Sequence, residues 1–326
     1  MRYVSRRFAF YLLTAVVAIS LNFLLPRLMP GNPAQILLAN FKGRVNPEAI
    51  KSVSAQFGLG HGSMWSEYIQ YWRQLLHGDL GISFTFYPSS VASVIGNTLP
   101  WTLWLIGLST VISFAVGTLL GILAAWRRGS WLDSLMPITT FFSAMPYFWF
   151  GLVAAYVFSG LLGWLPQSGG YSDNVSIGWS WGFASSAIYH AFLPALTIIV
   201  SSIAGWMLGM RNMMLTTIDD DYVIMAEAKG LPARRIMFAY AARNAILPSI
   251  ADFALSLGFV VSGAILTEIV FSYPGIGYTL YQAVENEDYP LMQGIFLVIT
   301  LAVLIANLLA DLCYAALDPR TRQGAG

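Results

Sequence analysis

Long apolar runs separated by polar segments make up most of this chain. A helix that crosses a bilayer needs about 20 mostly apolar residues. The pattern predicts six such helices, over residues 8–28, 101–126, 134–163, 186–210, 246–271 and 290–317. We therefore expect an all-α integral membrane protein with six transmembrane helices. The first run follows three arginines, as in a signal peptide, but it is long for one and no A-x-A-like site follows, so we expect it to be retained.

Residues 29–100 form a polar insert that is too long for a turn. Two of its segments, "PEAIKSVSAQFGL" and "SEYIQYWRQLLHGDLG", have the apolar spacing of helices, and Gly78 and Gly81 close the second. We expect a small helical insert on the outer leaflet. The organisation is then an N-terminus with the first helix (1–28), the insert (29–100), a five-helix membrane core (101–317) and a tail (318–326).

Charge is scarce and unevenly placed. Only 10% of the residues are charged and 57% are hydrophobic, whereas soluble domains carry about 25% charged residues, so most of the surface must face lipid. Twelve of the 17 lysines and arginines fall on one side of the predicted membrane, and the other five lie at or after the end of the first run. Because basic residues gather on the cytoplasmic side, we expect both termini and the 211–246 loop to be cytoplasmic.

Motifs for catalysis and for nucleotide binding are missing from the sequence. It holds no G-x-x-x-x-G-K-[ST] and no H-E-x-x-H, and its three histidines are far apart. The single cysteine, Cys313, excludes an internal disulfide and a cysteine-rich metal site. A net charge of +1 argues against nucleic acid as a partner. We do not expect an enzyme.

Three acidic residues lie inside the predicted spans: Asp252, Glu268 and Asp311. A charge buried in lipid is costly, so such residues are functional candidates. Each lies within about two turns of a span end, where pairing or helix capping would also explain it. Both roles, helix-end pairing and lining of a solute path, stay open.

Small residues and prolines recur within the runs. The patterns Gly117-x-x-x-Gly121 and Gly205-x-x-x-Gly209 allow helices to approach closely. Three prolines are expected to kink their helices, namely Pro137, Pro146 and Pro194.

The loop before the fifth run carries a capped helix. Asp220 or Asp221 is placed to cap an N-terminus, Tyr222–Lys229 forms a short helix, and Gly230 suits the left-handed position that ends it. A second helix, Ala233–Ala245, leads into the fifth span. Composition alone leaves two roles open: a solvated connection, or a rigid element that fits a groove on a soluble partner.

Several segments together resemble the permease subunits of ABC importers. "AEAKGLP" (226–232) and "AARNAILP" (241–248) resemble the coupling loop of the dipeptide, oligopeptide and nickel group, in particular its first, B-type permease. Ile224 and Arg243 replace a glutamate and a proline of the general pattern. "LMPGNP" (28–33), "HGDLGISF" (77–84), "TEIVFSYPGIGYTLYQAVENEDYPLMQG" (267–294) and "NLLADLCYAALDPR" (307–320) extend the match over nearly the whole chain.

The resemblance implies a machine of several subunits in the bacterial cytoplasmic membrane. A second homologous permease would complete the path, two ATPase subunits would grip the coupling helices, and an extracytoplasmic binding protein would deliver the solute. ATP and Mg would be bound by the ATPases, and this chain would hold no cofactor. The residues implied in ATPase contact, with Ala226 and Gly230 central, are Asp221, Tyr222, Val223, Met225, Ala226, Glu227, Ala228, Lys229, Gly230 and Leu231.

The solute is less determined than the machine. Peptides are the first expectation, and oligosaccharides are a close second because "GWMLGMRNMM" (205–214) departs from peptide permeases and the extracytoplasmic loop near 164–185 is aromatic. The same aromatic residues would also suit a membrane interface; they are Trp164, Tyr171, Trp179 and Trp181. Nickel is third. A self-contained channel or ion-coupled carrier is the alternative of a different class, but inverted repeats and mid-membrane ionisable chains are not seen.

Overall fold

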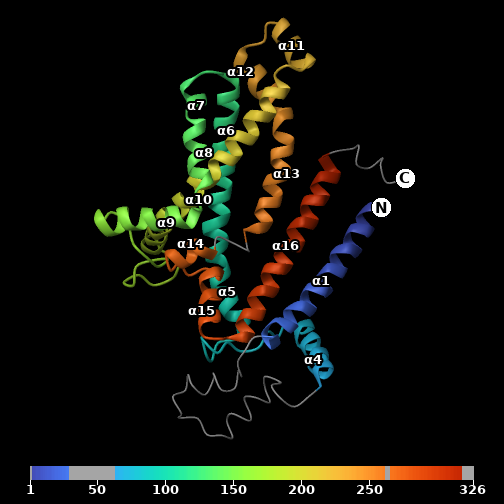
Figure 1. Ribbon diagram of the computed structural model, residues 1–326, viewed down its shortest axis with the longest axis vertical. Helices are drawn as coiled ribbons and strands as arrows, with labels where there is room; N and C mark the ends of the chain where they lie inside the picture. The colour runs from blue at the N-terminus through green and yellow to red at the C-terminus, as the bar shows by residue number, and fades with distance from the viewer. Residues whose placement is uncertain (1, 29–62, 261–264, 318–326) are drawn as a thin grey trace.

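The structure is a computed structural model that describes residues 2–28, 63–260 and 265–317. The first predicted insert helix, "PEAIKSVSAQFGL", lies outside these residues. The described part is helical, with one isolated bridge between Ile82 and Ser90 and no strand of greater length. The helices form an elongated bundle (Figure 1).

The described residues form a succession of helices along the chain. In order they are α1 (Arg2–Leu28), α4 (Met64–Leu76), α5 (Val91–Thr102), the π-helical η1 (Leu103–Gly107), α6 (Leu108–Trp126), α7 (Trp131–Ser134), α8 (Met136–Ala144), α9 (Tyr147–Ala154), the π-helical η2 (Ala155–Leu161), α10 (Trp181–Thr217), α11 (Asp221–Ala228), α12 (Ala233–Arg235), the π-helical η3 (Ile236–Ala242), α13 (Arg243–Phe259), α14 (Ile265–Val270), α15 (Ile276–Glu285) and α16 (Tyr289–Leu317).

Membrane-length helices match the predicted runs in part. Within the described residues four helical segments are long and apolar enough to cross a bilayer, namely Arg7–Leu24, Val91–Trp126, Trp181–Thr217 and Tyr289–Leu309. The pair α8 and α9–η2 would make a fifth, and it bends by 96° at its break. α13 covers the start of the fifth predicted span. The count of six therefore stays a prediction.

Two predicted features of these spans need correction or refinement. The second span starts at Val91 rather than residue 101, because Ser90 accepts a bond from the Ser93 N–H and begins the helix there. The 96° break in the third span falls at Pro146, as predicted, whereas α10 runs through Pro194 without interruption. Pro137 lies in the first turn of α8, where its missing N–H costs nothing.

α6 and α10 form the central contact of the bundle. A Cβ on Gly117 would lie 2.7 Å from the Ile203 carbonyl oxygen, and one on Gly121 would lie 2.5 Å from that of Met207. These glycines therefore let the two backbones touch, as predicted. Gly205 and Gly209 are different: they are exposed, and a Cβ at either position would have no atom within 4 Å. Their predicted close approach therefore does not occur within the described chain.

α13, α16 and α1 pack in turn beside this centre (Figure 1). Phe253 of α13 stacks on Phe114 of α6, with ring centroids 4.3 Å apart. Gly258 lies so close to Ala306 of α16 that any side chain there would collide. α1 runs antiparallel to α16, and the N-terminal end of α1 and the C-terminal end of α16 both point toward the end of the molecule that carries α11 (Figure 1).

The end opposite α11 is fastened by a buried carboxylate. Asp288 is fully buried at the N-terminus of α16, where its Oδ1 accepts the Leu291 N–H at 3.1 Å. Its Oδ2 accepts the Ser83 hydroxyl and the Thr85 N–H, the latter at 2.8 Å. One side chain thus ties the segment before α5 to α16. The α4 helix nearby ends as predicted at Gly78, which has φ +74°.

Candidate functional site

α11 is the short helix that the sequence predicts in the loop before the fifth span. It begins one residue early, at Asp221, with Asp220 at the N-cap in an extended conformation. The Asp220 side chain makes no capping hydrogen bond, so only the position of the predicted cap is right. Asp221 lies in the first turn, where a negative charge interacts favourably with the helix dipole.

The C-terminus of α11 has a sharp and fully bonded turn. Gly230 has φ +73°, its N–H donates to the Glu227 carbonyl at 2.8 Å, and the Leu231 N–H donates to the Ala226 carbonyl at 3.4 Å. This pair of bonds is the Schellman motif, which needs a left-handed residue at the glycine position. The predicted left-handed conformation of Gly230 at the end of the helix is confirmed. No atom lies within 4 Å of the place where a Cβ would be, so only backbone strain disfavours a side chain here.

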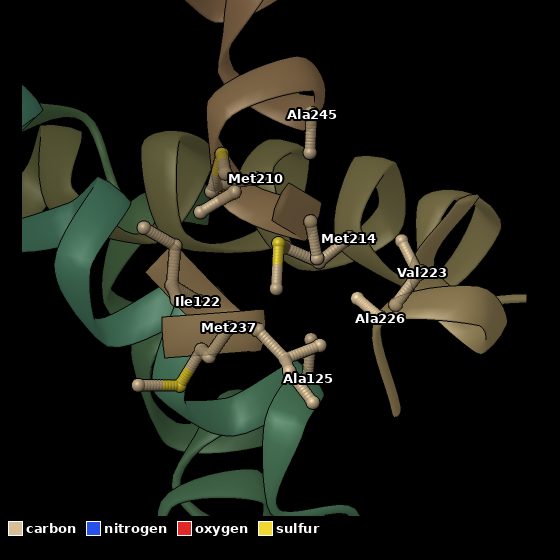
Figure 2. Close-up of a cluster of buried hydrophobic side chains, with 11 residues drawn as sticks. Ile122, Ala125, Met210, Met214, Val223, Ala226, Met237 and Ala245 are labelled. Atoms are coloured by element: carbon tan, nitrogen blue, oxygen red, sulfur yellow. The ribbon is translucent and has the colours of Figure 1, made fainter. Parts of the chain in front are cut away.

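One face of α11 is anchored in the chain's own core. Val223 and Ala226 are 3% and 2% exposed. Figure 2 shows them beside side chains of α6, α10, η3 and α13. The cluster of buried residues, here called the α11 anchor, consists of Ile122, Ala125, Met210, Met214, Val223, Ala226, Ile236, Met237, Ala241, Ala242 and Ala245.

The opposite face of α11 is open to solvent. Met225 is 60% exposed and Ile224 53%, so two neighbouring apolar side chains lie together on this face, and contiguous exposed apolar side chains are typical of interaction sites. The exposed members of the implied contact set are Asp221, Tyr222, Met225, Glu227, Ala228, Lys229 and Gly230. Leu231 is half-buried against the anchor. Val223 and Ala226 have their side chains buried in the chain's own core, and their implied part in ATPase contact stays a prediction.

The connection from α11 to the membrane helix is continuous. Pro232 caps α12, with the Arg235 and Ile236 N–H groups donating to its carbonyl at 2.8 and 3.2 Å. From there α12, η3 and α13 run without a break to Phe259. The predicted helix from 233 into the fifth span is therefore confirmed, with a π-helical stretch inside it. α11 packs against this same helix through the anchor, which includes residues of η3 and Ala245 of α13.

An open hollow of about 510 Å³ lies beside α11. Two exposed arginines, Arg235 and Arg243, give it a positive character. Its lining residues are Tyr222, Arg235, Ala239, Tyr240, Arg243 and Asn244. The exposed face of α11 and this hollow form one continuous surface, because Tyr222 belongs to both.

Of the three acidic residues in the spans, Glu268 is the most deeply buried. It is 1% exposed. Its Oε1 accepts the Thr102 hydroxyl at 2.7 Å, and its Oε2 accepts the N–H groups of Gly277 and Tyr278 at 2.7 and 3.2 Å. The carboxylate therefore occupies the N-terminus of α15 and links it to α5. Any side chain at Gly275 would collide with it.

Asp311 and Asp252 have contrasting surroundings. The Asp311 carboxylate accepts the Tyr11 hydroxyl at 2.7 Å and lies 3.0 Å from the Arg7 guanidinium, so it joins α16 to α1. Asp252 is exposed on α13. The three predicted candidates are thus not brought together.

Comparison with known proteins decides the family. Residues 117–323 match the family described as binding-protein-dependent transport system inner membrane component. The chain is 34% identical to the di/tripeptide transport system permease protein DppB of Pseudomonas aeruginosa, over 98% of each chain. It is 33% identical to the dipeptide transport system permease protein DppB of Escherichia coli K12 over 99% of each, and 31% identical to the oligopeptide transport system permease protein AppB of Bacillus subtilis over 92% of each.

The chain belongs to this family. It is a multi-pass inner-membrane permease of the ABC importer type and not an enzyme, as the sequence predicted.

Two segments left the solute open in the sequence, namely residues 205–214 and the aromatic loop. Met207, Met210 and Met214 are at most 1% exposed and fill the core along α10. In the aromatic loop Tyr171 stacks on Trp101 at 5.8 Å, whereas the tryptophans are exposed. Within the described residues no group of three histidine, cysteine, aspartate or glutamate side chains is placed to hold a metal ion.

Sequence reasoning missed the buried Asp288. A signal for it was present, because an aspartate two residues before Pro290 suits an N-cap. Its hydrogen-bond partners Ser83 and Thr85 precede it by 205 and 203 positions in the sequence, and no local pattern predicts such distant contacts.

Proposed function

We propose that this permease is one of two homologous membrane subunits of an ATP-driven importer of short peptides. Two ATPase subunits bind the coupling helices of the two permeases, and an extracytoplasmic binding protein delivers the peptide. ATP and Mg are bound by the ATPases, and this chain supplies the path and the coupling helix. The single observation that carries the proposal is the two-faced α11, anchored inward by Val223 and Ala226 and exposed outward at Met225.

The shape of α11 supports a mechanical role better than a solvated connection. A mere linker has no need of a helix with one face packed into the core and its end fixed by a Schellman turn. Tyr222, Ile224 and Met225 present a compact apolar surface with charged neighbours. Such a surface suits a groove on a soluble protein. We infer that the exposed part of the α11 surface touches the ATPase and that the anchor passes its displacement to α13.

Peptide as the solute is supported by the relatives. Those named above transport dipeptides, di/tripeptides or oligopeptides according to their names, and they align over more than nine-tenths of this chain. Nickel gains no support from the four methionines of α10, because Met207, Met210 and Met214 are buried in the core and Met213 alone among them is exposed. Oligosaccharide import gains no support from the position of Tyr171, which is stacked within the fold.

The arrangement of charges supports an orientation with both termini in the cytoplasm. α11, the hollow with Arg235 and Arg243, and the loop with Arg127 and Arg128 lie at one end of the molecule (Figure 1). That end is the basic one, and basic loops face the cytoplasm. The segment with α4 then lies on the outer side.

The mechanism we propose is alternating access. ATP binding closes the ATPase pair, and each coupling helix moves with the ATPase that holds it. α11 and α13 share the anchor, so the membrane helices move with them and the paired permeases open outward. Hydrolysis restores the inward-open state. The work comes from the difference in ATPase affinity between the two states.

Copurification and reconstitution test the function. Purified from its native membrane in mild detergent, the permease should carry a second permease of similar length and an ATPase pair. In liposomes with the binding protein, this complex should accumulate dipeptides only when ATP is present. A permease that purifies alone and moves solute without ATP would contradict the proposal and favour a self-contained channel or carrier.

A further inference from the structure

α13 has two open faces of different chemistry. Residues on one side pack on α6 and α10, where Phe253 stacks on Phe114, and residues on another side pack on α16, where Gly258 meets Ala306. Between these contacts the helix leaves two strips exposed. One carries Leu247, Ile250 and Leu257 and is apolar.

The other strip is polar from Asn244 to Asp252, and the exposed Phe259 follows on the same side seven residues later. Asn244, Pro248 and Asp252 are all exposed and follow one another at intervals of four residues, so they lie in line along the helix. Pro248 has no N–H to donate to the Asn244 carbonyl, four residues earlier. The strip therefore combines an amide side chain, a backbone carbonyl without its usual helical donor and a carboxylate.

Asp252 lies inside α13 rather than at either end of it. α13 begins at Arg243 and ends at Phe259, so Asp252 has about two turns of helix or more on each side. Asp252 lies nine positions after Arg243, or about 14 Å along the axis. With Arg243 at the cytoplasmic edge of the predicted fifth span, this is close to half of the roughly 30 Å hydrocarbon thickness. The sequence prediction counted the depth of Asp252 from residue 246, where the apolar run begins, and α13 begins three residues earlier, at Arg243.

A carboxylate at this depth is costly to hold against lipid. Among the described residues Asp252 has no ion pair or side-chain hydrogen bond that would neutralise it, and it remains exposed. Ionisable groups in spans face a water-filled cavity or a polar partner, because facing hydrocarbon is costly. Backbone carbonyls without their helical partner are likewise tolerated where they line water. The apolar strip at Ile250 has no such requirement.

We propose that the face of α13 with Asn244, Pro248 and Asp252 lines the aqueous path of the permease, and that the Asp252 carboxylate holds the ammonium group of a passing peptide. The second half rests on the proposed peptide function. A peptide at neutral pH carries one ammonium and one carboxylate, and only the ammonium complements this face. In water-filled surroundings such an ion pair is weak, which suits a site that must also release its ligand.

The lining is tested by thiol accessibility. The complete transporter, in liposomes and with Cys313→Ser as background, carries either Asp252→Cys or the matched control Ile250→Cys from the apolar strip. A membrane-impermeant, positively charged methanethiosulfonate should modify position 252 at least about tenfold faster than position 250. Equal rates at the two positions would overturn the lining. If the Asp252→Asn variant no longer copurified with the second permease, the path-lining role would also be overturned, because the carboxylate would then bind the other subunit.

The ammonium contact is tested by charge. With the binding protein saturated by a dipeptide, Asp252→Asn should lower uptake per ATP hydrolysed about tenfold, Asp252→Glu should restore most of it, and Ile250→Ala should change little. Uptake by Asp252→Asn at the wild-type rate would overturn the contact. If liposomes with the wild-type transporter hydrolysed ATP but took up no peptide, the proposed peptide function would be overturned, and the ammonium contact with it. The path-lining role of α13 is decided by the thiol modification rates alone.

Discussion

Substitution of Gly230 tests whether α11 must keep its docked geometry. The residue has φ +73° and no atom within 4 Å of a Cβ position, so the effect of a side chain is conformational strain alone. A left-handed conformation costs an L-residue roughly 1–2 kcal/mol, and more for a β-branched one. Strain of this size lowers the equilibrium constant for the native turn about 5–30-fold.

The series Gly230→Asn, Gly230→Ala and Gly230→Val should therefore show graded loss of coupling, because asparagine tolerates the left-handed region best and valine worst. We expect the assembled complex to form in all three and ATP hydrolysis to continue. Peptide uptake per ATP hydrolysed, measured in liposomes, should fall in that order. The loss should be smallest for asparagine and largest for valine.

Gly78 supplies the matched control. It has φ +74° and open space around it, but it ends α4 at the opposite end of the molecule. Gly78→Val imposes the same strain there and should leave the ratio of uptake to hydrolysis unchanged. Normal coupling in Gly230→Val, or equal losses in Gly78→Val, would refute the reasoning that α11 geometry transmits the motion.

Three further predictions concern packing. Gly121→Val should push α6 away from α10 and lower the free energy of unfolding by about 1–3 kcal/mol, measured as a lower Tm in detergent. Gly205→Ala is the control and should leave Tm unchanged, because a Cβ there has open space. Equal Tm shifts in the two variants would contradict the close packing at Gly121. Asp288→Ala removes an N-cap and a buried acceptor and should cost roughly 2–4 kcal/mol, measured by the same melt; an unaltered Tm would exclude its fastening role. Ala226→Leu should overfill the α11 anchor and lower Tm. Met225→Ala should leave Tm unchanged and weaken ATPase binding in a pull-down. The reverse pattern would contradict the assignment of Ala226 to the buried face of α11 and of Met225 to the exposed face.

Local signals made the ends of α11 predictable. Gly230 fixes the C-terminus because only a residue at ease with positive φ completes the turn. Pro146 fixed the break in the third span for a similarly local reason. Asp220 marked the start, although its side chain does not bond as expected.

The orientation of faces was not predictable from spacing. Val223 and Ala226 look like surface residues of a short helix until α6, α10 and η3 are placed around them. The same limit explains why Gly117 and Gly121 pack closely while Gly205 and Gly209 do not. A small-residue pattern shows that close approach is allowed, and only the tertiary arrangement decides where it happens.

Long-range polar bonds were beyond sequence reasoning for the same reason. Glu268 was assigned two open roles, and its bonds to Thr102 and to the start of α15 are visible only once three segments converge.

Site-specific cross-linking from α11 tests the central claim most directly. In the assembled transporter with Cys313→Ser, a photoactivatable cross-linker attached to Met225→Cys on the exposed face should join the permease to an ATPase subunit. The same probe at Val223→Cys, whose side chain lies in the anchor, should give products within the permease. Cross-links from position 225 that reach only lipid, or only the permease itself, would contradict the account of α11 as the coupling element.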